Sequence, residues 1–181
     1  MKVTETALPG VLLLAPRQWS DARGMFMETY NHRVMEDLGL PTHWPQDNFS
    51  QSRRNVVRGL HYQITQPQGK LVRVLSGAAL DIAVDLRRGS PTFGKSVALE
   101  LRAEDGTMLW IPPGFAHGFA ALTEQLSFAY KVTDYYSAAG ERTILWNDPA
   151  LGIEWPVSES DAIVSSKDAA GTRFADAQVF A

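Results

Sequence analysis

Short apolar segments dominate the chain from Asn48 onward, and clusters of Gly, Pro, Asn and Asp separate them. Short segments rich in Val, Leu, Ile and aromatic residues, bounded by turn residues, are typical of antiparallel sandwiches and barrels. No helix-length segment stands between successive strands, which disfavours a doubly wound parallel sheet. The sequence therefore predicts an all-β fold, with strands in VVRGLHYQI, KLVRVLSG, LDIAVDL, SVALELRA, TMLWIPPG and QLSFAYKV.

One segment has helical character. In ETYNHRVMEDLGL the residues Tyr30, Val34 and Leu38 recur every fourth position, and Gly39 provides a stop signal. The stretch after Trp155 is richer in Ala, Ser, Asp and Gly, and we expect it to wrap the outside as loops and short helical turns. The length of 181 residues, 45% of them hydrophobic, suits a single domain over residues 1–181 with one sizeable core.

The charged residues are balanced, with 17 Lys and Arg against 20 Asp and Glu. Like charges form no block, so we expect no nucleic-acid partner and no membrane surface. The absence of cysteine excludes disulfides, thiolate metal sites and cysteine nucleophiles. The apolar run GVLLLAP is too short to span a bilayer, and Glu5 precedes it, unlike a secretory signal. We therefore expect a soluble, cytoplasmic protein.

Arg58, His61 and Lys70 lie among apolar residues in two predicted strands. Successive side chains of a strand point to opposite faces, so alternation predicts which residues point the same way. In the first strand His61 shares a face with Val57, Gly59 and Gln63, and Arg58 shares the other face with Leu60 and Tyr62. Lys70 shares a face with Val72 and Val74, and Tyr130 shares one with Leu126, Phe128 and Val132. A buried cation needs a compensating anion. Spacing alone leaves open whether acidic side chains or an anionic ligand provides it, and a lone His in a strand is more often a hydrogen-bonded core residue or a surface residue than a catalyst. If these faces line a barrel interior, they form a polar ligand pocket in an apolar wall.

His117 follows a Pro and Gly turn in IPPGFAHGF, and the pattern of Pro112, Gly114 and His117 matches the second half of the cupin signature. In that signature the His is often a metal ligand. The HxH first half is absent, and a catalytic metal site usually needs three protein ligands. A metal held by His61, His117 and a carboxylate remains an alternative. The missing motif favours metal-free chemistry in a cupin-like barrel.

Eight strings in order resemble the dTDP-4-dehydrorhamnose 3,5-epimerase family: QDNFS, VVRGLHYQ, QGKLVRV, DIAVDLR, PPGFAHGF, YKVTDYYS, ILWNDP and GIEWP. The resemblance runs from about Arg23 to Asp168. It implies a jelly-roll, cupin-type antiparallel β-barrel with short peripheral helices, usually assembled as a homodimer. It also implies epimerisation of a dTDP-4-keto-6-deoxy sugar in dTDP-L-rhamnose biosynthesis, without metal or cofactor.

The resemblance implies a role for each matching residue. His61 falls on the general base, Tyr130 on the general acid, Lys70 near the developing enolate, and Asp168 on the carboxylate that pairs with the base. Contacts with the sugar, nucleotide or diphosphate are implied for Arg23, Glu28, Gln46, Asp47, Asn48, Arg58, His117, Glu141 and Lys167, and a position near the thymine for Tyr136. The chain departs from the family pattern at Asn55, where Gly is common. Because Asn tolerates the left-handed backbone, this departure concerns turn geometry and not chemistry.

These residue types suit the implied reaction. A 4-keto group acidifies the C–H bonds at C3 and C5, so inversion needs a base on one face and an acid on the other. Histidine, with a reference pKa of about 6.5, suits the base, and tyrosine, at about 10, stays protonated until it donates. An ammonium stabilises the enolate oxygen, and the fork of Arg58 suits phosphate. The alternatives are a single-carbon epimerase of a related sugar, a metal-dependent cupin enzyme, and a noncatalytic dTDP-sugar-binding cupin.

Overall fold

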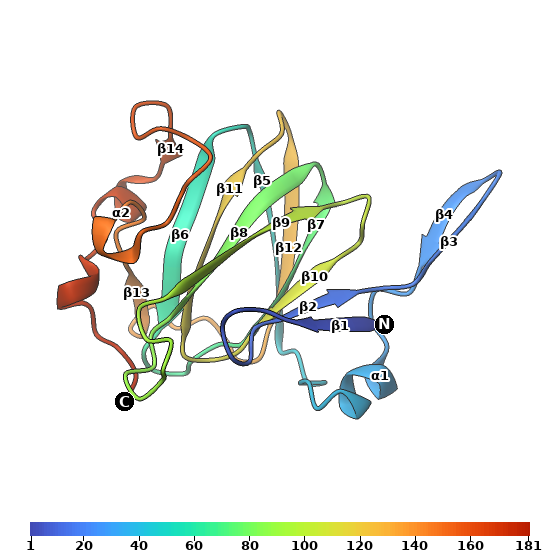
Figure 1. Ribbon diagram of the computed structural model, residues 1–181, viewed down its shortest axis with the longest axis horizontal. Coiled ribbons are helices and arrows are strands. Elements are labelled where there is room, and N and C mark those ends of the chain that lie inside the picture. Colours follow the sequence, from blue (N-terminus) through green and yellow to red (C-terminus); the bar gives the residue numbers. More distant parts are fainter.

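The computed structural model describes residues 1–181 and consists mainly of two antiparallel sheets that face each other (Figure 1). The first sheet has the order β1 (Lys2–Glu5), β2 (Leu12–Ala15), β10 (Met108–Ile111), β7 (Lys70–Ser76), β12 (Leu126–Val132), β5 (Gln46–Ser52). The second has the order β13 (Glu141–Thr143), β6 (Val56–Gln63), β11 (Phe115–Ala121), β8 (Ala78–Asp85), β9 (Ser96–Arg102). Strand β14 (Ile163–Val164) joins β6 in parallel. The chain crosses repeatedly between the sheets, as in a jelly roll.

A separate hairpin of β3 (Gln18–Asp21) and β4 (Gly24–Met27) projects away from both sheets as an arm (Figure 1). We call residues 18–27 the N-terminal arm. Trp19 and Phe26 pair across it, with ring centroids 5.9 Å apart. Nevertheless 46% of Trp19 and 68% of Phe26 is exposed. The arm therefore carries apolar surface that this chain leaves uncovered.

The helices are short and peripheral: α1 (His32–Asp37), α2 (Ser166–Ala169), and the 3-10 turns η1 (Pro149–Leu151) and η2 (Phe174–Asp176). Asn31 caps α1, because its side chain accepts hydrogen bonds from the backbone N–H groups of Arg33 and Val34. The chain turns away at Gly39, where φ is +66°. The predicted helix is thus confirmed in a shorter form. No helix has the length and apolar content to cross a membrane.

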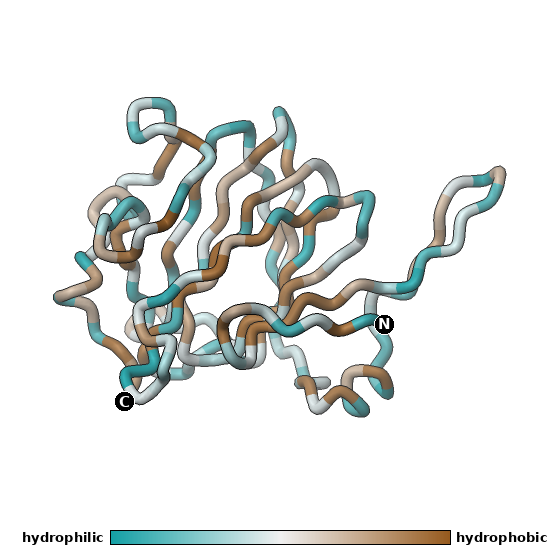
Figure 2. Tube along the Cα trace, in the orientation of Figure 1, coloured by the Kyte–Doolittle hydropathy of each residue, from teal (hydrophilic) through white to brown (hydrophobic).

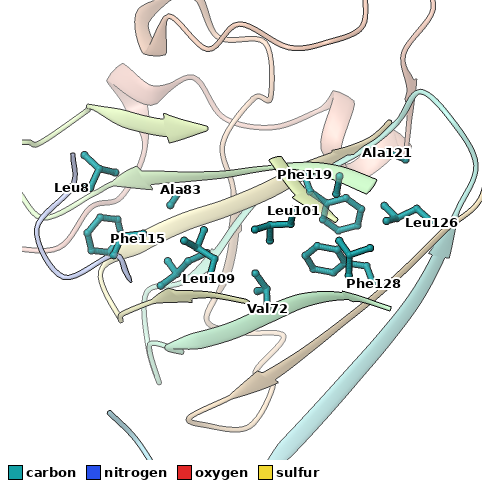
Figure 3. Close-up of a cluster of buried hydrophobic side chains, with 14 residues drawn as sticks. Leu8, Val72, Ala83, Leu101, Leu109, Phe115, Phe119, Ala121, Leu126 and Phe128 are labelled. Carbon is teal, nitrogen blue, oxygen red and sulfur yellow. The ribbon is translucent and has the colours of Figure 1, made fainter. Parts of the chain in front are cut away.

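The main core lies between the sheets, where the apolar stretches of the central strands meet (Figure 2). It is a cluster of buried side chains that includes Val72, Leu101, Leu109 and the rings of Phe119 and Phe128 (Figure 3). Those two rings come from opposite sheets and stack with centroids 4.2 Å apart. We call the sheet faces that meet here the inner faces.

Both outer faces are partly covered by the ends of the chain. Around α1, the buried Met35 packs with Leu14, Leu71 and Met108 of the first sheet. The C-terminal segment covers the second sheet, where Leu60, Tyr62, Ile82 and Val84 form another buried cluster. The residues after Trp155 thus lie on the outside of the second sheet, as the sequence predicts.

The all-β prediction is confirmed, and each of the six segments named from the sequence contains a strand. Asn55 is also confirmed as a left-handed residue, with φ of +68° immediately before β6. One prediction is wrong. Strict alternation along β6 places Arg58 and His61 on opposite faces, whereas a bulge brings them to the same face, as described next.

Candidate active site

A cavity of about 690 Å³ opens between the inner faces, lined by residues of β5, β6, β7, β11 and β12 and of the segment around α2. Both sheets and the C-terminal segment therefore contribute to one site. Most of the residues singled out from the sequence line this cavity: Asn48, Arg58, His61, Lys70, His117, Tyr130, Tyr136, Glu141, Lys167 and Asp168.

An extra residue in β6 sets the direction of Arg58 and His61. His61 lies opposite His117 in the ladder with β11, whereas Arg58 lies opposite Phe119. Three steps along β6 thus match two along β11, which is a β-bulge and reverses the alternation of faces. Leu60 and Tyr62 pack on the outer face, away from Arg58. Both functional side chains consequently line the same cavity.

Two glycines permit the close approach of the β6 and β11 backbones at the bulge. A Cβ atom on Gly59 would lie 2.5 Å from the Cα of Gly118, and a Cβ on Gly118 would lie 2.7 Å from the carbonyl oxygen of Arg58. Gly59 also has a φ of +128°, which side-chain-bearing residues rarely adopt. Only glycine fits at these two places without moving backbone.

His61 is paired with Asp168 from the far end of the chain. Its Nε2 lies 2.6 Å from Oδ1 of Asp168, and Oδ2 of the same carboxylate accepts from the backbone N–H of Gly59 at 3.2 Å. The Oγ of Ser165 caps α2 and holds the backbone N–H of Asp168. Burial would raise the pKa of Asp168, but the hydrogen bonds from His61 and Gly59 outweigh it and lower that pKa. The carboxylate fixes Nε2, so the other ring nitrogen of His61 is free to act on a ligand.

Lys70 and Tyr130 enter the cavity from the first sheet. Only 8% of Lys70 is exposed, and its Nζ donates to the backbone carbonyl of His61 at 3.3 Å. Burial lowers the pKa of Lys70 to about 8, although Asp81 and Glu141 act in the opposite direction. Burial likewise raises the pKa of Tyr130, which keeps its hydroxyl protonated at neutral pH.

A second imidazole–carboxylate pair lies deeper in the site. The Nε2 of His117 is 2.9 Å from Oδ2 and 3.1 Å from Oδ1 of Asp81, a fully buried residue of β8. Burial lowers the pKa of His117 and raises that of Asp81. Sequence reasoning missed Asp81. Its signal is an acidic residue inside the apolar strand LDIAVDL, in a fold where buried carboxylates need partners.

The cavity rim is a connected polar network. Glu141 accepts from Lys167 Nζ at 2.5 Å and from the Tyr136 hydroxyl at 2.9 Å. Burial raises the pKa of Glu141, but the hydrogen bonds from Lys167 and Tyr136 outweigh it, so the group stays ionised. Gln46 lies behind the cavity wall, where its side chain accepts from the Tyr136 backbone N–H and donates to Asn48.

Arg58 is held at the other side of the cavity. Its Nε donates to Ser52 Oγ at 3.1 Å and its terminal nitrogen donates to the Gln51 carbonyl at 3.1 Å. Both acceptors are neutral, and no carboxylate pairs with the guanidinium. The positive charge therefore remains available to an anion in the cavity.

Three residues singled out from the sequence lie away from the cavity of this chain. Arg23 is at the tip of the N-terminal arm, where it pairs with Asp21, and Glu28 accepts a hydrogen bond from Asn31. Asp47 points to the outer face of β5 and pairs with Lys131 at 2.9 Å. The structure does not bring these side chains to His61.

The site offers limited means of holding a metal ion. No group of three or more His, Cys, Asp or Glu side chains is arranged to bind one. The two imidazoles turn Nε2 toward different carboxylates instead of toward a common point. The metal set of His61, His117 and a carboxylate, considered from the sequence, is therefore not formed.

Comparison with known proteins agrees with this geometry. Residues 5–176 match the family model described as dTDP-4-dehydrorhamnose 3,5-epimerase. A protein of that name from Pseudomonas aeruginosa is 52% identical over 181 residues, covering 99% of both chains. The crystal structure of the enzyme from Elizabethkingia anophelis NUHP1 superposes with a TM-score of 0.92, at 43% identity over 97% of both chains.

A third relative carries a ligand. The crystal structure of dTDP-6-deoxy-D-glucose-3,5-epimerase from Legionella pneumophila Philadelphia 1, in complex with dTDP-4-keto-L-rhamnose, has a TM-score of 0.91 and 45% identity. The match covers 95% of this chain and 92% of that one. The jelly-roll fold is thus shared over almost the whole length. With the sequence match, the common fold and a cavity built from the expected residues, the chain belongs to the dTDP-4-dehydrorhamnose 3,5-epimerase family.

Proposed function

We propose that the chain inverts C3 and C5 of dTDP-4-dehydro-6-deoxy-D-glucose to give dTDP-4-dehydro-L-rhamnose. The reaction proceeds by proton transfer, with no cofactor. One observation carries the mechanism: His61 and Tyr130 belong to opposite sheets and line the same cavity. A sugar ring between them would present one face to an imidazole and the other to a phenol, which is what inversion at carbon requires.

His61 acts as the base. Asp168 accepts from its Nε2, so the opposite ring nitrogen takes the proton from the carbon beside the 4-keto group. The buried carboxylate then stabilises the imidazolium that forms, as in other carboxylate–histidine pairs. This role needs the ring of His61 to keep one orientation throughout, and the pairing with Asp168 supports that.

Lys70 and Tyr130 complete the proton transfer. Loss of the proton moves charge to the former carbonyl oxygen, and the ammonium of Lys70, which is only 8% exposed, stabilises that enolate. Tyr130, protonated because burial raises its pKa, returns a proton from the other side. Removal and return of a proton occur once at C3 and once at C5. Between the two rounds His61 releases its proton to water and Tyr130 takes one up from water.

The remaining residues hold the nucleotide. Arg58 provides an unpaired guanidinium for the diphosphate, and Tyr136, 56% exposed at the rim, provides an aromatic surface for the base. Asn48, Glu141 and Lys167 line the same cavity, where they would contact the nucleotide, its diphosphate or the pocket rim. His117 contacts the sugar from the cavity floor.

The active unit in this proposal is a homodimer. Arg23 and Glu28 lie far from the cavity of their own chain, and the N-terminal arm that carries Arg23 exposes Trp19 and Phe26. We propose that the arm of each protomer docks on its partner and brings these residues to the partner's cavity. Mixing Arg23→Ala protein with His61→Ala protein tests this, because half of the dimers would be mixed and each would hold one intact site. About a quarter of wild-type activity should return; no return would refute the exchange.

One incubation tests the reaction itself. The protein is mixed with dTDP-4-keto-6-deoxyglucose in deuterated water, and NMR follows C3 and C5. Deuterium at both carbons with inversion is the expected result, His61→Ala should abolish it, and the exposed His43→Ala should not. Exchange at one carbon alone would indicate a single-carbon epimerase, and tight binding with no exchange would indicate a binding protein.

A further inference from the structure

The ammonium of Lys70 is buried with too few partners. Its one hydrogen bond goes to the His61 carbonyl at 3.3 Å, and no carboxylate lies within salt-bridge distance. A charge removed from water needs a compensating charge nearby, or the group loses its proton. An acidic residue near the cavity must therefore keep Lys70 charged.

Three carboxylates surround the cavity, and two of them have more than one hydrogen-bond donor. Glu141 is paired with Lys167 at 2.5 Å. Asp168 is paired with His61 at 2.6 Å and also accepts from the Gly59 N–H. Glu141 also accepts from the Tyr136 hydroxyl, so each of these two carboxylates has two hydrogen-bond donors apart from Lys70.

Asp81 is the exception. It is fully buried on β8, and its only side-chain partner is His117, whose pKa burial lowers, so the ring is neutral at neutral pH. A neutral imidazole can donate Nε2–H to Asp81 but cannot cancel its charge. The carbonyl that Lys70 contacts belongs to His61, which lies opposite His117 in the ladder of β6 with β11, and His117 contacts Asp81, so the three groups form one cluster. Within it Asp81 raises the pKa of Lys70 and Lys70 lowers that of Asp81, so each favours the charged form of the other. They form a buried pair of opposite charges with His117 beside them.

We propose that Asp81 is a positioning residue that keeps Lys70 in its ammonium form and holds His117 as a neutral donor to its carboxylate. The charge pairing is a property of the fold alone. Its consequence for turnover rests on the proposed function, in which the Lys70 ammonium stabilises an enolate. No role in the reaction is assigned to Asp81 itself, because its carboxylate is fully buried behind His117.

Other titratable groups face Lys70 and enter the same balance. They are Asp81 on β8, His117 on β11, His61 and Arg58 on β6, Tyr130 on β12, Glu141 on β13, and Lys167 and Asp168 on α2. Among the three carboxylates, Asp81 is the one with a single hydrogen-bond donor, the Nε2 of neutral His117. Its removal should therefore affect Lys70 more than the removal of any other carboxylate.

A stability cycle tests the pairing without reference to activity. Asp81→Asn, Lys70→Met and the double variant are unfolded thermally at pH 7. Asp81→Asn alone leaves a buried ammonium uncompensated and should lower Tm, whereas in the Lys70→Met background the same change should lower Tm by less than half as much. Equal losses in both backgrounds would overturn the pairing. If Asp81→Asn does not fold but the double variant does, that result supports the pairing. If Lys70→Met folds and the double variant does not, that result refutes the pairing.

A pH profile tests the consequence for turnover. The reaction needs protonated Lys70, so kcat falls as pH rises through the pKa of Lys70. Without Asp81 that pKa drops, and the alkaline limb of kcat should move down by about one pH unit or more. A shift of one unit corresponds to about a fivefold loss at pH 8, about twofold at pH 7 and almost none at pH 6. A loss that is uniform across pH would overturn the proposed effect on turnover.

Asp85→Asn is the matched control. Asp85 lies on the same strand and is equally buried, but its carboxylate accepts from Arg87, Ser90 and Thr92. Its replacement should lower Tm to the same extent in the presence and absence of Lys70 and leave the alkaline limb in place. Coupling of Asp81 to Lys70 in a protein that shows no proton exchange at C3 or C5 would leave the pairing intact and refute the epimerase function.

Discussion

Replacement of Asp168 by Asn removes the charge that orients His61 while keeping nearly the same volume. The carboxylate has two acceptor oxygens, one facing His61 Nε2 at 2.6 Å and one facing the Gly59 N–H at 3.2 Å. An amide has only one acceptor, so its NH2 group must face one of these two partners. If it faces His61, Nε2 must accept, and the nitrogen that should take the substrate proton becomes an N–H. If it faces Gly59, two donors meet.

The size of the effect follows from this geometry. Loss of a correctly oriented base typically costs about a hundred- to ten-thousand-fold in rate, equivalent to about 3 to 5 kcal/mol in the barrier. Because the Asp168 side chain is only 4% exposed, the unsatisfied donor should also destabilise the fold by about 1 to 3 kcal/mol. The stability loss depends on pH. The pKa of Asp168 is lowered in the fold, so its contribution is present above the unfolded pKa of about 4 and is lost as pH falls through the lower folded pKa.

Deuterium exchange at C3 and C5, followed by NMR, measures the rate, and chemical denaturation at pH 7 and pH 3 measures the stability. Asp176→Asn serves as the control, because it changes the charge equally at an exposed position of the C-terminal segment. The difference in stability between wild type and Asp168→Asn should shrink at pH 3. Wild-type exchange by Asp168→Asn would show that the pair has no part in proton transfer.

Three further expectations follow from the site. Tyr130→Phe should lower the rate of inversion about a hundred- to ten-thousand-fold but retain some deuterium exchange from the His61 side. Inversion of C5 at the wild-type rate would show that Tyr130 is a packing residue only. Arg58→Ala should weaken dTDP binding in calorimetry by about 1.5 to 3 kcal/mol, more than His61→Ala does, because its guanidinium meets the diphosphate; an unchanged affinity would contradict this assignment. Activity should survive exhaustive chelation, since His61 and His117 point to separate carboxylates, and stoichiometric metal whose removal abolishes turnover would contradict the mechanism.

The strands and the composition of the core could be predicted because they depend on local patterns. Alternation correctly placed Tyr130 beside Phe128 and Val132, and Lys70 beside Val72 and Val74. It failed between Arg58 and His61, since a bulge leaves the residue pattern of a strand almost unchanged. The nearest signal was Gly59, because glycine inside a strand often marks a bulge or a close approach of backbones.

Contacts between distant segments were harder to predict. Asp168 was assigned to His61 only through family resemblance, since 107 positions separate the two residues. Asp81 was missed because its partner lies on a neighbouring strand, and the pairing register of two strands cannot be read from either one. Arg23 lies in the N-terminal arm and Glu28 directly follows it. The local sequence around these two residues does not indicate whether they would reach the cavity of their own chain or that of a partner chain.

The bulge in β6 has a consequence for the number of residues in the strand. Between its pairs with Phe119 and His117, β6 has one residue more than β11, and this extra residue lets both Arg58 and His61 line the cavity. A barrel without the extra residue would present one of these two side chains to its interior, never both. Deletion of one residue between Arg58 and His61 would restore regular alternation and turn one of these two side chains out of the cavity.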